Sequence, residues 1–244
     1  MKNIFPVINV YKKKTKKSEV TTQLLYGDTF KKTKQSSAWM EIKNDLDGYK
    51  GFVEKKKFTL NDVCTHKVYV LYATLYSKPN DHKKINKKLS FGSKVKILKK
   101  NKNFYKFDKY WIKKNDLQKI SHKNSDLFFY IKKFIGVKYM WGGKYYKGVD
   151  CSGLVQLLLN YNNKFCPRDA KDQLNYFKKK IILKNIKKND LIFWKGHVAV
   201  ILSKNKVIHA YGPLKRVVVM SLKKTINRIY RTANLKVIGI RRVN

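Results

Sequence analysis

The sequence predicts an α+β protein in which two small β-barrels precede a domain of helices followed by an antiparallel sheet. Three observations support this prediction. Short alternating apolar runs broken by turn residues fill the first half, helical spacing begins after Ser121, and strand-like runs return after Asp190. Helices followed by strands are typical of α+β domains. We therefore predict three domains, at residues 1–62, 63–121 and 122–244.

Composition limits the class of protein. The chain has 244 residues, of which 43% are hydrophobic, so it can form a sizeable core and is not a disordered polypeptide. No run approaches the roughly 18–20 apolar residues of a membrane span. The apolar stretch near the N-terminus is short, contains Pro6 and Asn9, and lacks a small-residue cleavage site. We therefore expect no membrane span and a cytoplasmic location.

The charge is strongly positive, with 57 Lys and Arg against 15 Asp and Glu, a net charge of +42. Clustered cations favour polyanions such as nucleic acids. Here, however, only six of the basic residues are Arg, and the Lys residues are spread along the whole chain among Asn, Ile and Tyr. This pattern indicates a compositional bias toward Lys, so we expect no specific nucleic-acid partner.

The first half contains a weak internal repeat. Each copy has a Gly-containing turn followed by short apolar runs, which favours strands over helices. The first copy has 25–28, 39–42 and 51–53, and the second, about 65 residues later, has 91–93, 104–107 and 110–112.

The second half begins with helices. Ser125 and Asp126 are candidate caps for a helix over Leu127–Ile135, a second helix begins at Cys151, and a third runs from Ala170 to Phe177. Strands are then expected at 191–194, 197–202, 206–210, 217–220 and 237–240.

Cys151 is the strongest candidate for a reactive group. It begins an apolar helix, where backbone N–H groups and the helix dipole stabilise a thiolate, and it follows Gly142-Gly143, which permit close backbone approach. The alternative is a buried structural cysteine. Cys64 and Cys166 are interpreted as packing residues. Three cysteines provide neither a disulfide framework nor paired CxxC motifs, so we predict no metal site.

Two histidines could serve such a nucleophile. His197 and His209 lie on successive predicted strands, and their separation of 12 residues is even. In a hairpin with its turn near Ser203 they would face each other on one side of the sheet. One histidine could then act as base while the other fixes its tautomer. Each taken singly could also be an ordinary strand residue.

Four motifs together resemble a known family. Tyr-x-Trp-Gly-Gly, Asp-Cys-Ser-Gly-Leu-Val, Gly-His-Val and Ile-His-Ala occur in this order within residues 122–244. They are similar to the NlpC-type papain-like cysteine peptidases, which cleave peptidoglycan stem peptides. The two preceding domains resemble bacterial SH3-like barrels. The resemblance implies a papain-like catalytic domain that needs no cofactor.

The resemblance also assigns roles to individual residues. Cys151 would be the nucleophile, His197 the general base and His209 the residue that orients it. Tyr139 would help to form the oxyanion hole, while Asp150, Ser152 and Trp141 would belong to the substrate cleft.

One further segment resembles a subgroup with two SH3-like domains. Cys166-Pro167-Arg168-Asp169-Ala170 is similar to its Pro-Arg-Asp-Ser segment, although Ala170 replaces the Ser. In that subgroup the Asp pairs with the free amine of an N-terminal L-Ala, and Asp169 is the candidate here. Asp169 could equally be a helix N-cap, and the two roles are compatible. Glu19 and Tyr49 are cleft candidates by position only.

The resulting hypothesis is an endopeptidase that hydrolyses the γ-D-glutamyl-diamino acid bond of free-amine muropeptide fragments during cell-wall recycling. Its partners would be peptidoglycan stem peptides or muropeptides, with Lys or diaminopimelate at the third position. Three alternatives remain open: an exported hydrolase that acts on intact peptidoglycan, a non-catalytic muropeptide-binding module, and a binder of polyanions.

Overall fold

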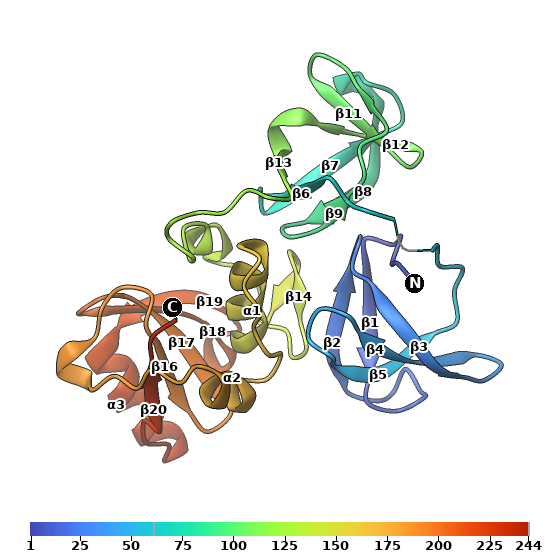
Figure 1. Cartoon of the computed structure of the whole chain (residues 1–244). Helices are drawn as coiled ribbons and strands as arrows, with labels where there is room; N and C mark the ends of the chain where they lie inside the picture. Colours follow the sequence, from blue (N-terminus) through green and yellow to red (C-terminus); the bar gives the residue numbers. More distant parts are fainter. Residues whose placement is uncertain (61, 244) are drawn as a thin grey trace. The chain divides into compact units, whose positions relative to one another are not determined.

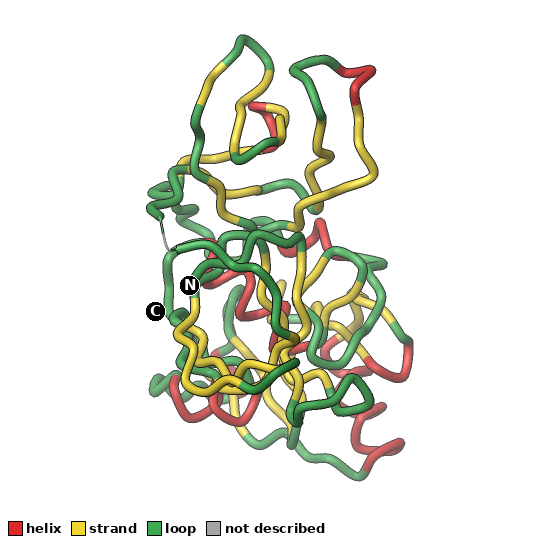
Figure 2. Tube along the Cα trace, turned by 90° about the vertical axis from the view of Figure 1, so that its right-hand side faces the viewer, coloured by secondary structure: helices red, strands yellow, loops and turns green. Residues whose placement is uncertain are grey.

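The computed structural model describes residues 1–60 and 62–243, which form two compact units (Figure 1). The first unit contains Met1–Lys123, apart from Asn61, together with Gly142–Tyr146. The second contains Asn124–Trp141 and residues 147–243. The division of the N-terminal half at residue 62 stays a prediction. Helices are short, as the red segments of Figure 2 show, and strands predominate.

The first sheet lies in the N-terminal unit and has the strand order β2-β1-β5-β4-β3. Burial alternates along β1, β4 and β5, as period-2 patterning predicts, and the core of the sheet includes the fully buried Leu24, Phe30 and Ile42. Its strands are β1 Val7–Tyr11, β2 Val20–Leu25, β3 Phe30–Gln35, β4 Trp39–Asn44 and β5 Lys50–Glu54.

A second β-rich region follows in the same unit, with a core of its own around Val68, Leu89 and Ile112. Its sheets have the orders β10-β11-β12-β7-β8 and β13-β6-β9. Among the described residues the strand ladders of neither region close into a complete barrel. The strands are β6 His66–Val68, β7 Tyr72–Tyr76, β8 Lys84–Ser90, β9 Lys94–Val95, β10 Lys99–Lys100, β11 Phe104–Phe107, β12 Tyr110–Lys113 and β13 Leu117–Lys119.

The weak sequence repeat corresponds to a structural one. Gly27 follows β2 and Gly92 follows β8, and their φ angles of +85° and +82° both lie in the left-handed region. Each glycine N–H donates to a carbonyl early in its region, from Asn3 and Val68 respectively. In both regions, therefore, a turn that requires positive φ follows an edge strand of the larger sheet.

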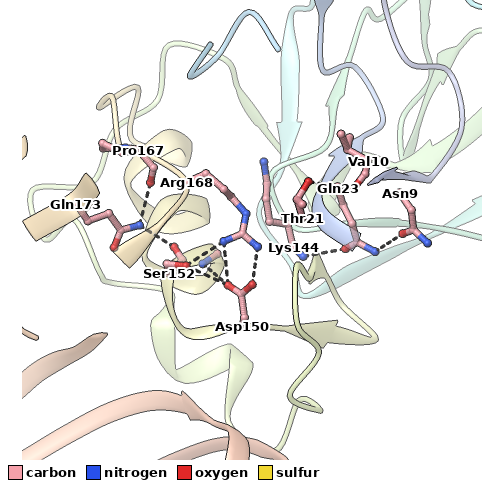
Figure 3. A network of polar contacts seen from close by, with 11 residues as sticks. Asn9, Val10, Thr21, Gln23, Lys144, Asp150, Ser152, Pro167, Arg168 and Gln173 are labelled. Atoms are coloured by element: carbon pink, nitrogen blue, oxygen red, sulfur yellow. Dashed lines mark hydrogen bonds and ion pairs between the residues drawn. The ribbon is translucent and has the colours of Figure 1, made fainter. Parts of the chain in front are cut away.

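The segment Gly142–Tyr146 folds with the first unit and includes β14 Lys144–Tyr145. Gly142 has φ +72°, and a Cβ atom there would lie 2.2 Å from the Val20 carbonyl oxygen, so the predicted close backbone approach is present. The Lys144 N–H donates to Gln23 Oε1 at 2.8 Å, and the Gln23 amide donates to Asn9 (Figure 3). Gln23 thus links this segment to the first sheet.

The second unit contains an antiparallel sheet in the order β19-β18-β17-β16-β20, which confirms the predicted α+β class. All five predicted strands are present, with ends shifted by at most two residues. They are β16 Leu191–Trp194, β17 His197–Ser203, β18 Lys206–Tyr211, β19 Arg216–Ser221 and β20 Gly239–Arg241, and β15 Gly148–Val149 lies outside this sheet.

Three helices accompany this sheet. α1 Cys151–Tyr161 packs against β17 and β18, and α2 Ala170–Tyr176 packs against α1 and β20; both helices were expected. α3 Leu222–Ala233 was not expected. It packs on β18 and β19, begins at the Ser221 cap, and buries Leu222, Thr225 and Ile229. The spacing of these residues, three and four apart, is the pattern in the sequence that indicates this helix.

The helix predicted over residues 127–135 is wrong. The chain instead forms successive turns and one 3₁₀ turn at Ile131–Phe134. The Phe128 N–H bonds to Asp126 Oδ1, and the N–H groups of Phe129, Ile131 and Lys133 bond to carbonyls three residues back rather than four, as an α-helix would require. Ile131 and Phe134 are nevertheless buried, because a 3₁₀ turn also places residues that are three apart on the same side of the backbone.

No helix among the described residues is long and apolar enough to cross a membrane.

Candidate active site

Cys151 is the first residue of α1 and is buried, with 7% of its surface exposed. Asp150 precedes it at the N-cap and accepts a hydrogen bond of 2.6 Å from the Gly153 N–H. This bond satisfies one of the N–H groups that a helix N-terminus leaves unpaired. The start of the helix, and with it the position of the thiol, is therefore fixed by the preceding residue in the chain.

Arg168 holds the same cap from the other side. Its Nη1 and Nη2 donate to the two Asp150 carboxylate oxygens at 3.0 and 2.5 Å, and Nη1 also donates to Ser152 Oγ at 2.9 Å (Figure 3). Both charged side chains are buried, at 1% and 8% exposed. Gln173 Nε2 adds bonds to the Ser152 and Pro167 carbonyls. A bidentate pair of this kind strongly restricts orientation.

This network includes Asp150 and Ser152, two residues that the sequence places in the substrate cleft. The polar atoms of Asp150 and Ser152 are engaged with Arg168, next to the nucleophile. Their predicted place in the substrate cleft stays a prediction; their contacts in the structure position Cys151. No role of Arg168 is predicted from the sequence, although Arg168 precedes Asp169 in the segment 166–170 that resembles the subgroup. The one feature of the sequence that sets Arg168 apart is that it is an Arg in a chain whose basic residues are mostly Lys.

The two histidines come together as the hairpin argument predicted, but in another register. His197 Nε2 lies 2.8 Å from His209 Nδ1. The pairings Val200↔Ile208 and Ile201↔Val207 move the hairpin two residues from the predicted alignment, so the histidines are diagonal rather than directly opposite. A shift of two residues preserves the face of the sheet, which explains why the contact survives.

Cys151 lies beside β17. The backbone N–H of Val198, the residue after His197, bonds to the sulfur, and so does that of Ser152. These bonds lower the pKa of the thiol, as expected at a helix N-terminus. Burial and the nearby Asp150 carboxylate outweigh them and raise the pKa to about 12. The preformed thiolate that the helix position suggested is therefore disfavoured.

Burial has the opposite effect on the histidines, because their charged form is the cation. It lowers the pKa of His197 to about 4 and, together with the neighbouring His197, that of His209 to about 3. At neutral pH the resting site thus holds a neutral thiol and two neutral imidazoles. A thiolate forms when His197 accepts the proton.

Tyr139 lies near the thiol. Burial raises the pKa of its phenol, and the second cause of this shift is Cys151. The hydroxyl consequently stays protonated and can donate a hydrogen bond. The Tyr139 N–H bonds to the Lys215 carbonyl at 2.8 Å, and its backbone also pairs with Val149, which fixes the segment before the site. Trp141, by contrast, is 59% exposed.

Asp169 is at the N-cap of α2, as one of the two sequence interpretations required. Its side chain makes no capping hydrogen bond to that helix, in contrast to Asp150. It is half-buried and follows Arg168 directly in the chain. The amine-binding role stays a prediction.

Comparison with known proteins agrees with this geometry. Residues 136–234 match the model of the NlpC/P60 family. The C-terminal part of the chain is an NlpC/P60 domain. The family resemblance seen in the four sequence motifs is thereby confirmed.

Relatives also match beyond this domain. The chain is 27% identical over 236 residues to a γ-D-glutamyl-L-lysine dipeptidyl-peptidase of Bacillus subtilis, covering 85% of this chain and 77% of that protein. A Bacillus cereus protein of the same name is 26% identical, covering 80% and 68%. A solved NlpC/P60 family protein from Bacillus cereus superposes with a TM-score of 0.83 over 99% of this chain and 98% of that chain, at 19% identity. The shared fold therefore includes the β-rich N-terminal half.

Proposed function

We propose that this protein is a cysteine endopeptidase that hydrolyses the γ-D-glutamyl-diamino acid bond of peptidoglycan stem peptides. The observation that carries the proposal is the arrangement of Cys151 at a capped helix N-terminus beside the hydrogen-bonded pair His197 and His209. Relatives named γ-D-glutamyl-L-lysine dipeptidyl-peptidases, similar over most of the chain, support the bond assigned.

The first chemical step is attack on the γ-D-glutamyl carbonyl. His197 accepts the thiol proton as the Cys151 sulfur bonds to the carbonyl carbon. The carbonyl oxygen becomes an oxyanion, for which the protonated Tyr139 hydroxyl and backbone N–H groups near Cys151 are the available donors. The Asp150–Arg168 pair keeps the helix N-terminus in place during this step.

Collapse of the tetrahedral adduct breaks the C–N bond. His197 returns its proton to the leaving amine of the diamino acid, and a thioester remains on Cys151. Water then attacks the thioester, with His197 accepting one of its protons. The products are a γ-D-glutamyl carboxylate and the restored thiol.

We further propose that the substrate is a fragment with a free N-terminal L-Ala, bound through its amine by Asp169. A half-buried carboxylate favours an ammonium group over the neutral amide of an uncut chain. The neighbouring Arg168 supports this assignment. Its side chain binds Asp150 at the cap of the nucleophile's helix, which holds the backbone next to Asp169 close to the site. Such fragments arise inside a cell that recycles its wall, which favours a cytoplasmic enzyme.

Two synthetic peptides test the proposal, L-Ala-γ-D-Glu-L-Lys and its N-acetylated form, each also made with diaminopimelate. We expect cleavage of the free-amine peptides at the γ-D-glutamyl bond, with mass spectrometry as the measurement of the products. In Cys151→Ala the rate of cleavage should fall by at least about 10³-fold. Cys64→Ala, a cysteine of the other unit, should retain full activity.

The same assay separates the alternatives. Equal cleavage of both forms would exclude amine recognition and favour a hydrolase of intact peptidoglycan. Absence of cleavage with retained peptide binding would favour a non-catalytic module.

A further inference from the structure

Met220 is the third member of a row of side chains that begins at His197. His209 Nδ1 lies 2.8 Å from His197 Nε2, and on the other side of the same ring His209 Nε2 lies 3.4 Å from Met220 Sδ. Met220 belongs to β19, the neighbour of β18, and is half-buried. Among the described residues these are the two polar contacts of the His209 ring.

The chemistry of these atoms determines which nitrogen of each imidazole carries the proton. A thioether sulfur has lone pairs and no hydrogen, so it accepts hydrogen bonds and donates none. A contact between His209 Nε2 and this sulfur is favourable when Nε2 carries the proton. In a neutral imidazole the other nitrogen is then an acceptor. His209 Nδ1 therefore accepts, and His197 Nε2 donates to it.

We propose that Met220 is a positioning residue that selects the tautomer of His209 and, through it, the tautomer of the base His197. With the proton of His197 held on Nε2, its Nδ1 carries the lone pair that removes the Cys151 proton. This inference rests on the proposed function of His197 as base. No carboxylate of the described residues contacts either histidine, so the Met220 sulfur is the group that sets the direction of their hydrogen bond.

The opposite tautomer explains why this choice matters. If His209 carried its proton on Nδ1, His197 Nε2 would have to accept, and the His197 proton would move to Nδ1. The nitrogen available to the thiol would then be a donor and could not act as base. Tyr211 stacks on His209 with ring centroids 4.7 Å apart and an angle of 15°, which opposes a ring flip that would put a ring carbon in place of each nitrogen.

Met220→Leu is the informative variant, because Leu has a similar volume and no acceptor. Histidine ¹⁵N NMR of the resting enzyme should show His209 with its proton on Nε2 in the wild type, and a mixture of tautomers in Met220→Leu. We expect kcat on the free-amine peptide to fall about fivefold with KM unchanged, in keeping with loss of one weak hydrogen bond. Met220→Gln, whose amide oxygen can accept, should restore the tautomer and most of the rate.

The control is Val219→Leu, an exposed neighbour on β19 that should change neither signal. The proposal is overturned if Met220→Leu keeps the wild-type tautomer, or if Met220→Gln loses as much activity as Met220→Leu, since either result assigns Met220 to packing alone. The NMR measurement needs no substrate. It therefore reports on Met220 even if the proposed peptidase activity is absent.

Discussion

Asp150 and Asp169 both stand at the N-cap of a helix in the same unit, yet their surroundings differ. Asp150 is buried, bonds to the Gly153 N–H, and is held by two nitrogens of Arg168. Asp169 is half-buried and makes no capping bond to α2. The Asp150 carboxylate caps its helix and pairs with Arg168, whereas Asp169 stands at a cap position without a capping bond. The N-cap position therefore does not by itself give an aspartate a capping role.

The largest effect should come from breaking the Asp150–Arg168 pair. Arg168→Leu leaves a buried carboxylate without its cation, so the free energy of unfolding should fall by about 3–5 kcal/mol, and kcat should fall as the start of α1 loosens. Urea denaturation and peptide hydrolysis measure the two effects. Arg242→Gln is the matched control, because it breaks an ion pair with buried Asp190 and should lower stability without changing kcat. Equal kcat losses in both variants would remove the special role of Arg168.

A second effect follows from the buried histidines. An unfolded histidine titrates near pH 6.5, whereas burial lowers the pKa of His209 to about 3 and that of His197 to about 4. Below pH 6.5 the unfolded chain binds protons that the folded chain does not, so stability falls with pH down to about pH 4. By pH 4 we expect His209 to lower the free energy of unfolding by about 3 kcal/mol, and the half-buried His197 to lower it by less.

Thermal unfolding between pH 7 and pH 4 checks this expectation. His209→Gln should flatten the acid slope, because it removes a group that must stay neutral in the fold. An unchanged slope would show that His209 is not buried in its neutral form.

The smallest effect on stability is expected at Asp169, where specificity should change instead. Asp169→Asn keeps a residue that favours N-caps, so unfolding should change by less than about 0.5 kcal/mol. KM for the free-amine peptide should rise about tenfold, and the preference over the N-acetylated peptide should disappear. Asp172→Asn, an exposed carboxylate in the first turn of the same helix, is the control. If both variants keep the preference, the amine is bound elsewhere.

The sequence by itself determined the class of fold, the helix that begins at Cys151 and the five strands of the C-terminal sheet. These features depend on local signals: a capping Asp, apolar spacing and turn residues. It also placed His197 and His209 on one face, since an even separation survives a register shift of two residues. It failed at residues 127–135, where helical spacing was satisfied by a 3₁₀ turn, and at α3, whose spacing was present but not recognised.

Only the tertiary structure decided the partners of the site. Arg168 lies 17 residues after Cys151 in the chain, and Met220 lies 11 residues after His209 on another strand. Neither contact has a local signal, because each depends on how a loop or a strand packs against its neighbour. Burial likewise set the protonation of Cys151 and the histidines, since the desolvation of a charge depends on the assembled environment and not on the residue type.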